Sequence, residues 1–92
     1  MALLFCEQGA MAHTTLRKTL RSRGHRLLIE LLVSAREAAG LTQRDLATRL
    51  KRPHSFVGRI EAGERRVDVI EFIEIARVLG ADPHKLLDRL MK

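Results

Sequence analysis

Residues 42–63 carry the sequence TQRDLATRLKRPHSFVGRIEAG, in which two short helical patterns flank a tight connection. The apolar side chains recur at helical spacing on both sides of that connection: Leu46, Ala47, Leu50, Val57 and Ile60. Pro53 interrupts the pattern because it lacks a backbone N–H and clashes with the turn before it. The stretch therefore predicts a helix-turn-helix.

The ends of these two helices carry residues with capping preferences. Thr42 can cap the first helix with its hydroxyl, and Gly63 follows the second as a C′ glycine would. We expect helices over about residues 43–50 and 54–62. Because isolated helices of this length are unstable in water, packing against other elements must hold both of them.

Three more helices are predicted around this pair. One covers about residues 25–39, one follows the capping residue Asp68, and one begins at Pro83. The predicted core positions of the last two are Val69, Phe72, Ile73, Ala76, Leu79, Leu86, Leu87 and Leu90. With no Trp, no Tyr and three Phe in 92 residues, the core must be mainly aliphatic, which favours packed helices over a sheet. The predicted fold is all-α, a compact bundle of five short helices.

The length suffices for one domain, which we divide into two parts. Residues 1–24 are expected to be a flexible N-terminal extension with a basic arm, and residues 25–92 the helical domain. The basic run consists of Arg17, Lys18, Arg21, Arg23 and Arg26. Such an arm can follow phosphates or enter a minor groove, but a frayed, solvated helix start would explain the run equally well.

The net charge of +6 predicts an anionic partner. Apart from the N-terminal run, the basic side chains gather around the second helix of the helix-turn-helix: Arg49, Lys51, Arg52, Arg59, Arg65 and Arg66. A solvated basic surface that aids solubility is the alternative. That alternative would explain evenly scattered charges better than it explains the two clusters in this sequence.

Cysteine usage and hydropathy indicate the compartment. Cys6 is the single cysteine, so no intramolecular disulfide can form and a reducing cytoplasm is the expected setting. The apolar residues 1–6 lack the basic region and the length of an export signal. No stretch approaches the ~20 apolar residues of a membrane span.

Three groups of residues at fixed spacing resemble the XRE family of phage-repressor-like DNA-binding proteins. They are Gly40-Leu41-Thr42-Gln43, Leu46-Ala47 and Ile60-Glu61-Ala62-Gly63. The resemblance covers about residues 27–90. It implies a sequence-specific regulator of transcription that binds double-stranded DNA, with the third helix in the major groove and no cofactor.

Outward side chains of the third helix are the expected base readers, namely His54, Ser55 and Arg59. Arg59 can form a bidentate pair with guanine, and His54 can donate or accept at a purine edge. Ser55 carries a hydroxyl that can serve a base or a phosphate. The alternative for all three is an ordinary solvated helix face.

Four residues are expected to contact backbone phosphates: Gln43, Arg52, Arg65 and Arg66. Gln43 corresponds to a family position that contacts phosphate and steadies the recognition helix, and a helix N-terminus also favours an anion there. Arg65 and Arg66 lie in the loop after the third helix, where family members touch phosphates. Alternatively, they only neutralise Glu64 and Asp68.

Other residues at matched positions are expected to be architectural. Arg36 and Glu61 stand where family members form an ion pair between the first and third helices. Lys51 replaces a glycine that usually closes the second helix; a residue other than glycine is strained in the left-handed conformation, so the turn there can be locally rebuilt. Gly58 costs ~1 kcal/mol relative to Ala inside a helix, so either close DNA or a tightly packed neighbour must require it. Phe56 is interpreted as a core wedge rather than a reader of thymine methyl groups.

An enzyme is not expected. The four histidines are far apart in sequence, and no carboxylate pair, glycine-rich phosphate loop or metal-ligand spacing appears. The competing class is an interaction module, for instance an antitoxin that binds a toxin and represses its own operon. A short toxin-like gene beside this one would favour that alternative.

A homodimer is expected because one recognition helix reads only a few base pairs. Ile70, Ile75 and Val78 lie off the predicted core stripe of the fourth helix, and Met91 extends the apolar side of the fifth. These residues predict an apolar patch for pairing. Alternatively, the N-terminal segment folds back and covers them.

Overall fold

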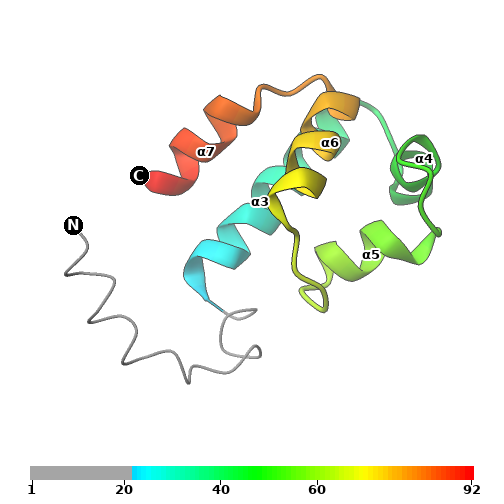
Figure 1. The fold of residues 1–92 in the computed structure, drawn as a ribbon, viewed down its shortest axis with the longest axis horizontal. Helices are drawn as coiled ribbons and strands as arrows, with labels where there is room; N and C mark the ends of the chain where they lie inside the picture. The colour runs from blue at the N-terminus through cyan, green and yellow to red at the C-terminus, as the bar shows by residue number, and fades with distance from the viewer. Residues whose placement is uncertain (1–21) are drawn as a thin grey trace.

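The computed structural model describes residues 22–92, which form five α-helices joined by short loops (Figure 1). They are α3 (Arg23–Ala38), α4 (Gln43–Arg49), α5 (Ser55–Glu61), α6 (Val69–Leu79) and α7 (Pro83–Met91). The predicted all-α fold is confirmed.

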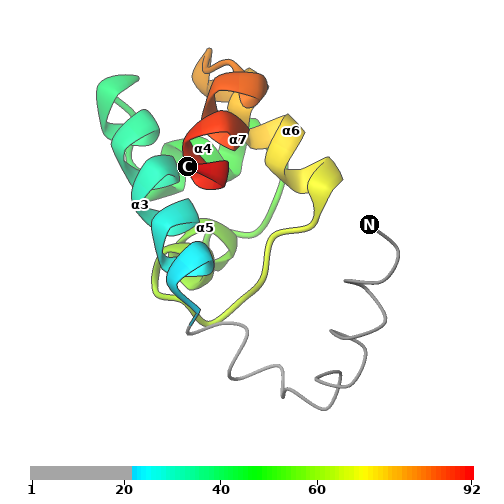
Figure 2. The same ribbon diagram turned by 90° about the vertical axis from the view of Figure 1, so that its left-hand side faces the viewer.

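The long helix α3 connects the two ends of the domain, because it contacts α5, α6 and α7. α4 and α5 pack against each other as the helix-turn-helix, and α4 also contacts α6. Figure 2 shows α7 lying between α3 and α6, both of which contact it. The helix-turn-helix therefore lies at one end of the molecule and α7 at the other (Figure 1).

Apolar side chains from all five helices meet in one core. The buried apolar residues are Leu31, Leu32, Leu46, Ala47, Phe56, Val57, Ile60, Phe72, Ile75, Ala76 and Leu86. Ala47 of α4 and Ala76 of α6 have no exposed surface, and these two helices contact each other. Since α4 and α5 are too short to be stable alone, this shared burial holds them in place.

Side-chain caps fix where α4 and α6 begin. Thr42 Oγ1 accepts a hydrogen bond from the Asp45 backbone N–H at 3.0 Å, and the Asp45 carboxylate accepts one from the Thr42 N–H at 3.0 Å. Asp68 and Glu71 form the same reciprocal capping box at the start of α6. Thr42 and Asp68 therefore cap their helices as predicted.

Burial on α6 and α7 differs from the prediction at three residues. Val69 and Leu87 are 70% and 46% exposed, so their predicted place in the core is wrong. Ile75 is 3% exposed, so its predicted place off the core stripe is also wrong. The buried stripe of α6 contains Phe72, Ile75 and Ala76 at i, i+3, i+4 spacing, because α6 packs against α3, α4 and α7 rather than against one neighbour.

The first described helix begins inside the predicted N-terminal extension. Ser22 caps α3 by accepting a hydrogen bond from the His25 backbone N–H at 3.1 Å, and the helix starts at Arg23. Arg23 and Arg26 of the basic run therefore belong to α3. The rest of the predicted arm, with Cys6 of the apolar start, lies outside the described residues.

Candidate nucleic-acid interface

The connection between α4 and α5 is closed by a lysine in the left-handed conformation. Lys51 has a φ of 58°, which residues other than glycine rarely adopt. Its N–H donates to the Thr48 carbonyl at 3.0 Å, and the Arg52 N–H donates to the Ala47 carbonyl at 3.0 Å. These are the two hydrogen bonds of a Schellman motif, which most often has glycine at this position. The turn is therefore not rebuilt: its two hydrogen bonds hold Lys51 in a conformation that is strained for a lysine.

The two sides of α5 differ in exposure. One side enters the core and consists of Phe56, Val57 and Ile60, so Phe56 is a core residue as interpreted. The other side is exposed and carries the predicted base readers Ser55 and Arg59, and the third predicted reader, His54, is exposed just before the helix. Ser55 and Arg59 are four residues apart and therefore neighbours on one helix face.

An ion pair joins α3 to α5. Arg36 Nε lies 2.7 Å from Glu61 Oε2, and Arg36 Nη2 donates to Glu61 Oε1 at 3.1 Å. The two side chains are only 12% and 9% exposed. Arg36 Nη1 also donates to the Leu41 carbonyl at 2.8 Å. One guanidinium therefore fixes both the end of α5 and the segment that leads into α4.

Gln43 lies against α5. Its Nε2 donates to Glu61 Oε1 at 2.8 Å. A Cβ added at Gly58 would lie 3.3 Å from Gln43 Oε1, which is closer than nine in ten contacts that real Cβ atoms make. A packed neighbour, one of the two explanations expected for Gly58, is therefore present. The glycine in α5 leaves room for the side-chain amide of Gln43, which comes from α4.

Arg52, Phe56, Arg65 and Glu71, which we call the Glu71 cluster, join the helix-turn-helix to α6. Arg65 donates from Nη1 and Nη2 to the two carboxylate oxygens of Glu71, both at 2.8 Å. Arg52 Nη2 lies 3.5 Å from Glu71 Oε2. The guanidinium carbons of Arg52 and Arg65 lie 4.8 and 4.7 Å from the centre of the Phe56 ring, within cation–π range.

Glu71 is the buried charge of this cluster, with 5% of its surface exposed. Hydrogen bonds from Arg65 hold the pKa of the Glu71 carboxyl below its usual value, so it is ionised at neutral pH. Sequence reasoning missed this residue, because it named Glu64 and Asp68 as the alternative partners of Arg65. The capping-box spacing from Asp68 to Glu71 is visible in the sequence, but the contact with the connection before α5 depends on tertiary structure.

The predicted DNA contacts lie on neighbouring segments: α5, the first turn of α4, the connection, and the loop after α5. We call them together the recognition face, consisting of Gln43, Arg52, His54, Ser55, Arg59, Arg65 and Arg66. Arg59 and Arg66 are exposed, and neither forms an ion pair within residues 22–92. Both guanidinium groups therefore keep all their donors for an anionic ligand.

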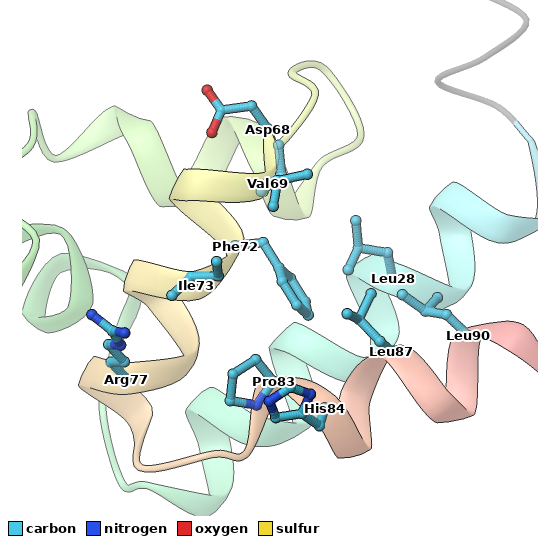
Figure 3. A pocket seen from close by; sticks show the side chains of 11 residues that line it. Leu28, Asp68, Val69, Phe72, Ile73, Arg77, Pro83, His84, Leu87 and Leu90 are labelled. Carbon is cyan, nitrogen blue, oxygen red and sulfur yellow. The ribbon is translucent and has the colours of Figure 1, made fainter.

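A second surface, on the other side of the core, is apolar. A groove of about 390 Å³ opens between α3, α6 and α7. We call it the apolar groove; its apolar lining includes Leu28, Phe72, Ile73, Leu87 and Leu90. Figure 3 shows the Phe72 ring pointing toward Leu28 and Leu87 across this space.

Among residues 22–92, no three His, Cys, Asp or Glu side chains gather closely enough to hold a metal ion. None of the helices α3 to α7 has the length and apolar character needed to cross a membrane.

Comparisons with known proteins agree on one kind of domain. A protein-family model described as a helix-turn-helix domain matches residues 28–90. Among solved structures, the chain is similar to an XRE-family like protein from Pseudomonas syringae pv. tomato str. DC3000, with 50% sequence identity and a TM-score of 0.74. That similarity covers 80% of this chain and 90% of the other. No curated protein matches the chain.

Proposed function

Since the chain belongs to the XRE family of helix-turn-helix DNA-binding proteins, we propose that it is a sequence-specific regulator of transcription whose helix α5 enters the major groove of double-stranded DNA. One observation carries this proposal. The apolar side of α5 is buried in the core, whereas Ser55 and Arg59 on its other side and His54 just before it are exposed. The lone cysteine fits action in a reducing cytoplasm.

The base readers differ in what they can recognise. Arg59 has no ion-pair partner within residues 22–92, so its planar guanidinium is free for the O6 and N7 acceptors of guanine. His54 precedes α5 without making a capping hydrogen bond, so its imidazole is available to a base edge. Ser55 serves either a base or a phosphate at the start of the helix.

Phosphate contacts come from the edges of the same surface: Gln43, Arg52, Arg65 and Arg66. Gln43 is held by Glu61 and lies at the first turn of α4, where backbone N–H groups favour an anion. Arg66 is exposed in the loop after α5. These contacts fix the orientation of α5 and carry no sequence information of their own.

The working unit is a homodimer that pairs through the apolar groove. A single recognition helix reads too few base pairs for high specificity, whereas two of them about 34 Å apart read an inverted repeat. Val69, Ile70 and Met91 are 70%, 65% and 83% exposed around α6 and α7, and a second copy would cover such residues. Of the residues predicted for this patch, Ile70 and Met91 are exposed, Val78 is half-buried against the core, and Ile75 is buried.

Selection of bound sequences from a random duplex library, at a stated salt concentration, tests the proposal. We expect one enriched motif with inverted repeats whose centres lie about one helical turn apart. Duplex affinity should also fall linearly on a log–log plot against salt, by roughly 0.9 per phosphate contacted.

Two results would contradict the proposal. If no sequence is enriched from the library, the protein is not a sequence-specific regulator, and the alternative of a protein-binding module such as an antitoxin is favoured. A salt-independent affinity would remove the phosphate contacts, because counterion release is their measurable consequence.

A further inference from the structure

We propose that Glu71 and Phe56 are positioning residues that hold Arg52 and Arg65 as one preformed phosphate contact beside the recognition helix. The proposal rests on the proposed function, because it needs duplex DNA to supply the phosphate. It adds two residues that do not themselves touch DNA but decide where two arginines point.

Glu71 brings the two guanidinium groups together from different parts of the chain. Arg52 comes from the connection before α5, and Arg65 comes from the loop after α5. Both have a terminal nitrogen near the same oxygen, Glu71 Oε2, at 3.5 and 2.8 Å. Two guanidinium groups that both lie this close to one oxygen atom repel each other unless an opposite charge lies between them. The buried carboxylate therefore permits the two arginines to stay adjacent.

Phe56 supplies a rigid surface for the pair. Its ring is 7% exposed and belongs to the core, so it cannot move independently of α5. Both guanidinium carbons lie close to the ring centre, at 4.8 and 4.7 Å. A planar guanidinium stacked on an aromatic ring has already lost much of its side-chain freedom, so it loses little more when it binds a phosphate.

The interactions within the cluster leave donors free on both arginines. Arg65 uses its two terminal nitrogens for Glu71 and for the Arg66 carbonyl, while its Nε forms no hydrogen bond within residues 22–92. Arg52 uses only Nη2, at the long distance of 3.5 Å. Their side chains are 39% (Arg52) and 35% (Arg65) exposed. Each guanidinium can therefore keep its internal partner and still donate outward.

The charge balance of the cluster also favours an anion. Two guanidinium charges lie within ion-pair distance of one carboxylate, so these contacts alone leave a net positive charge, whereas the Asp68 carboxylate attracts Arg65 from beyond that distance. Glu71 is ionised at neutral pH, since the hydrogen bonds from Arg65 lower its pKa. A phosphodiester group carries the single negative charge that would complete this balance.

The test compares two glutamates with opposite predicted effects. Glu71→Gln removes the charge that positions the arginines, and Glu64→Gln removes the same charge from an exposed site in the loop after α5. Duplex affinity is measured at several salt concentrations with the full chain, and thermal unfolding checks that each variant is folded at the temperature used. We expect Glu71→Gln to bind roughly tenfold more weakly, because charge-assisted hydrogen bonds to phosphate no longer form. The slope of log affinity against log salt should fall by about 0.9 for each phosphate that the arginines no longer neutralise.

Glu64→Gln should instead bind slightly more tightly with an unchanged slope, because it only removes a repulsive charge. If Glu71→Gln also binds more tightly with an unchanged slope, Glu71 acts as a simple negative charge and the proposal is overturned. Arg52→Ala, at an exposed residue, gives an independent measurement if Glu71→Gln does not fold. It should lower the slope by about 0.9, and an unchanged slope would overturn the proposal. Failure of the proposed function looks different, since the unaltered protein would then show no salt-dependent duplex binding at all.

Discussion

The recognition face and the apolar groove are built on the same core but use opposite chemistry. Around the recognition face, ion pairs and hydrogen bonds join Arg36 to Glu61 and Arg65 to Glu71. At the groove, α6 and α7 expose the apolar side chains of Val69 and Leu87, at 70% and 46%. A charged surface can satisfy its polar groups within one chain, whereas an apolar surface stays in water until a second molecule covers it. The first surface is therefore organised within one chain, and the second is the surface that the proposed dimer would bury.

The largest expected effect comes from breaking the ion pair behind the recognition face. Arg36→Ala should lower the free energy of unfolding by ~3–5 kcal/mol, because it leaves the mostly buried Glu61 carboxylate without its partner. Chemical denaturation measures this decrease. The double variant Arg36→Met with Glu61→Leu is the control and should cost far less, since no unpaired charge remains. Equal decreases in both variants would mean that packing rather than the pair holds α5.

A smaller effect is expected at the apolar groove. Leu87→Asp should weaken self-association by about 2 kcal/mol, roughly 30-fold, because it removes apolar contact and places a charge in the interface. Sedimentation at micromolar protein measures the association. Lys85→Gln changes the net charge equally on the exposed side of the same helix, outside the groove, and should leave association unchanged. A protein that is monomeric before either change would contradict the proposed dimer.

Two arginines of the recognition face should separate base readout from phosphate contact. Arg59→Ala should cost ~1–3 kcal/mol of duplex affinity and relax the preference at one base position, whereas Arg66→Ala should weaken all sequences about equally. Repeating the library selection with each variant measures both effects. If the selected motif is unchanged in Arg59→Ala, Arg59 contacts phosphate and the placement of α5 is wrong.

The smallest expected effect concerns the backbone between α4 and α5. Lys51→Gly should raise the free energy of unfolding by ~1 kcal/mol, because glycine adopts the left-handed conformation without the steric cost of a Cβ atom. Gly80→Ala is the matched control: φ is +71° and no atom lies near the added Cβ, so its destabilisation measures backbone strain alone. Thermal or chemical unfolding of both variants measures these changes in the free energy of unfolding. No gain in Lys51→Gly would show that the strain expected at this turn is negligible.

Much of the fold could be predicted because the relevant signals are local. Thr42 and Asp68 mark helix starts by their own capping preference, and Gly63 and Gly80 mark helix ends by theirs. Prediction failed where burial depends on how many neighbours a helix has. Ile75 is buried because α6 packs against more than one helix, including α3 and α4. The hydrophobic periodicity of α6 does not show how many other helices contact it.

The candidate site divides in the same way. The exposed positions of His54, Ser55 and Arg59 follow from helical geometry once Val57 and Ile60 are placed in the core. Helical geometry does not explain why residue 58 is a glycine. That depends on the Gln43 side chain of another helix, whose Oε1 lies 3.3 Å from where a Cβ would be.

By itself the sequence determined an all-α chain with a helix-turn-helix of the XRE family and a basic surface around it, because caps, periodicity and charge are properties of short segments. Only the tertiary structure decided which charges are paired and which are free. Arg65 and Arg66 are adjacent in the chain, yet Arg65 is held by the buried Glu71 and Arg66 is exposed without an ion pair among the described residues. A guanidinium finds its partner by position in space, and that position is set by the packing of α5 against the core and of the following loop against α6.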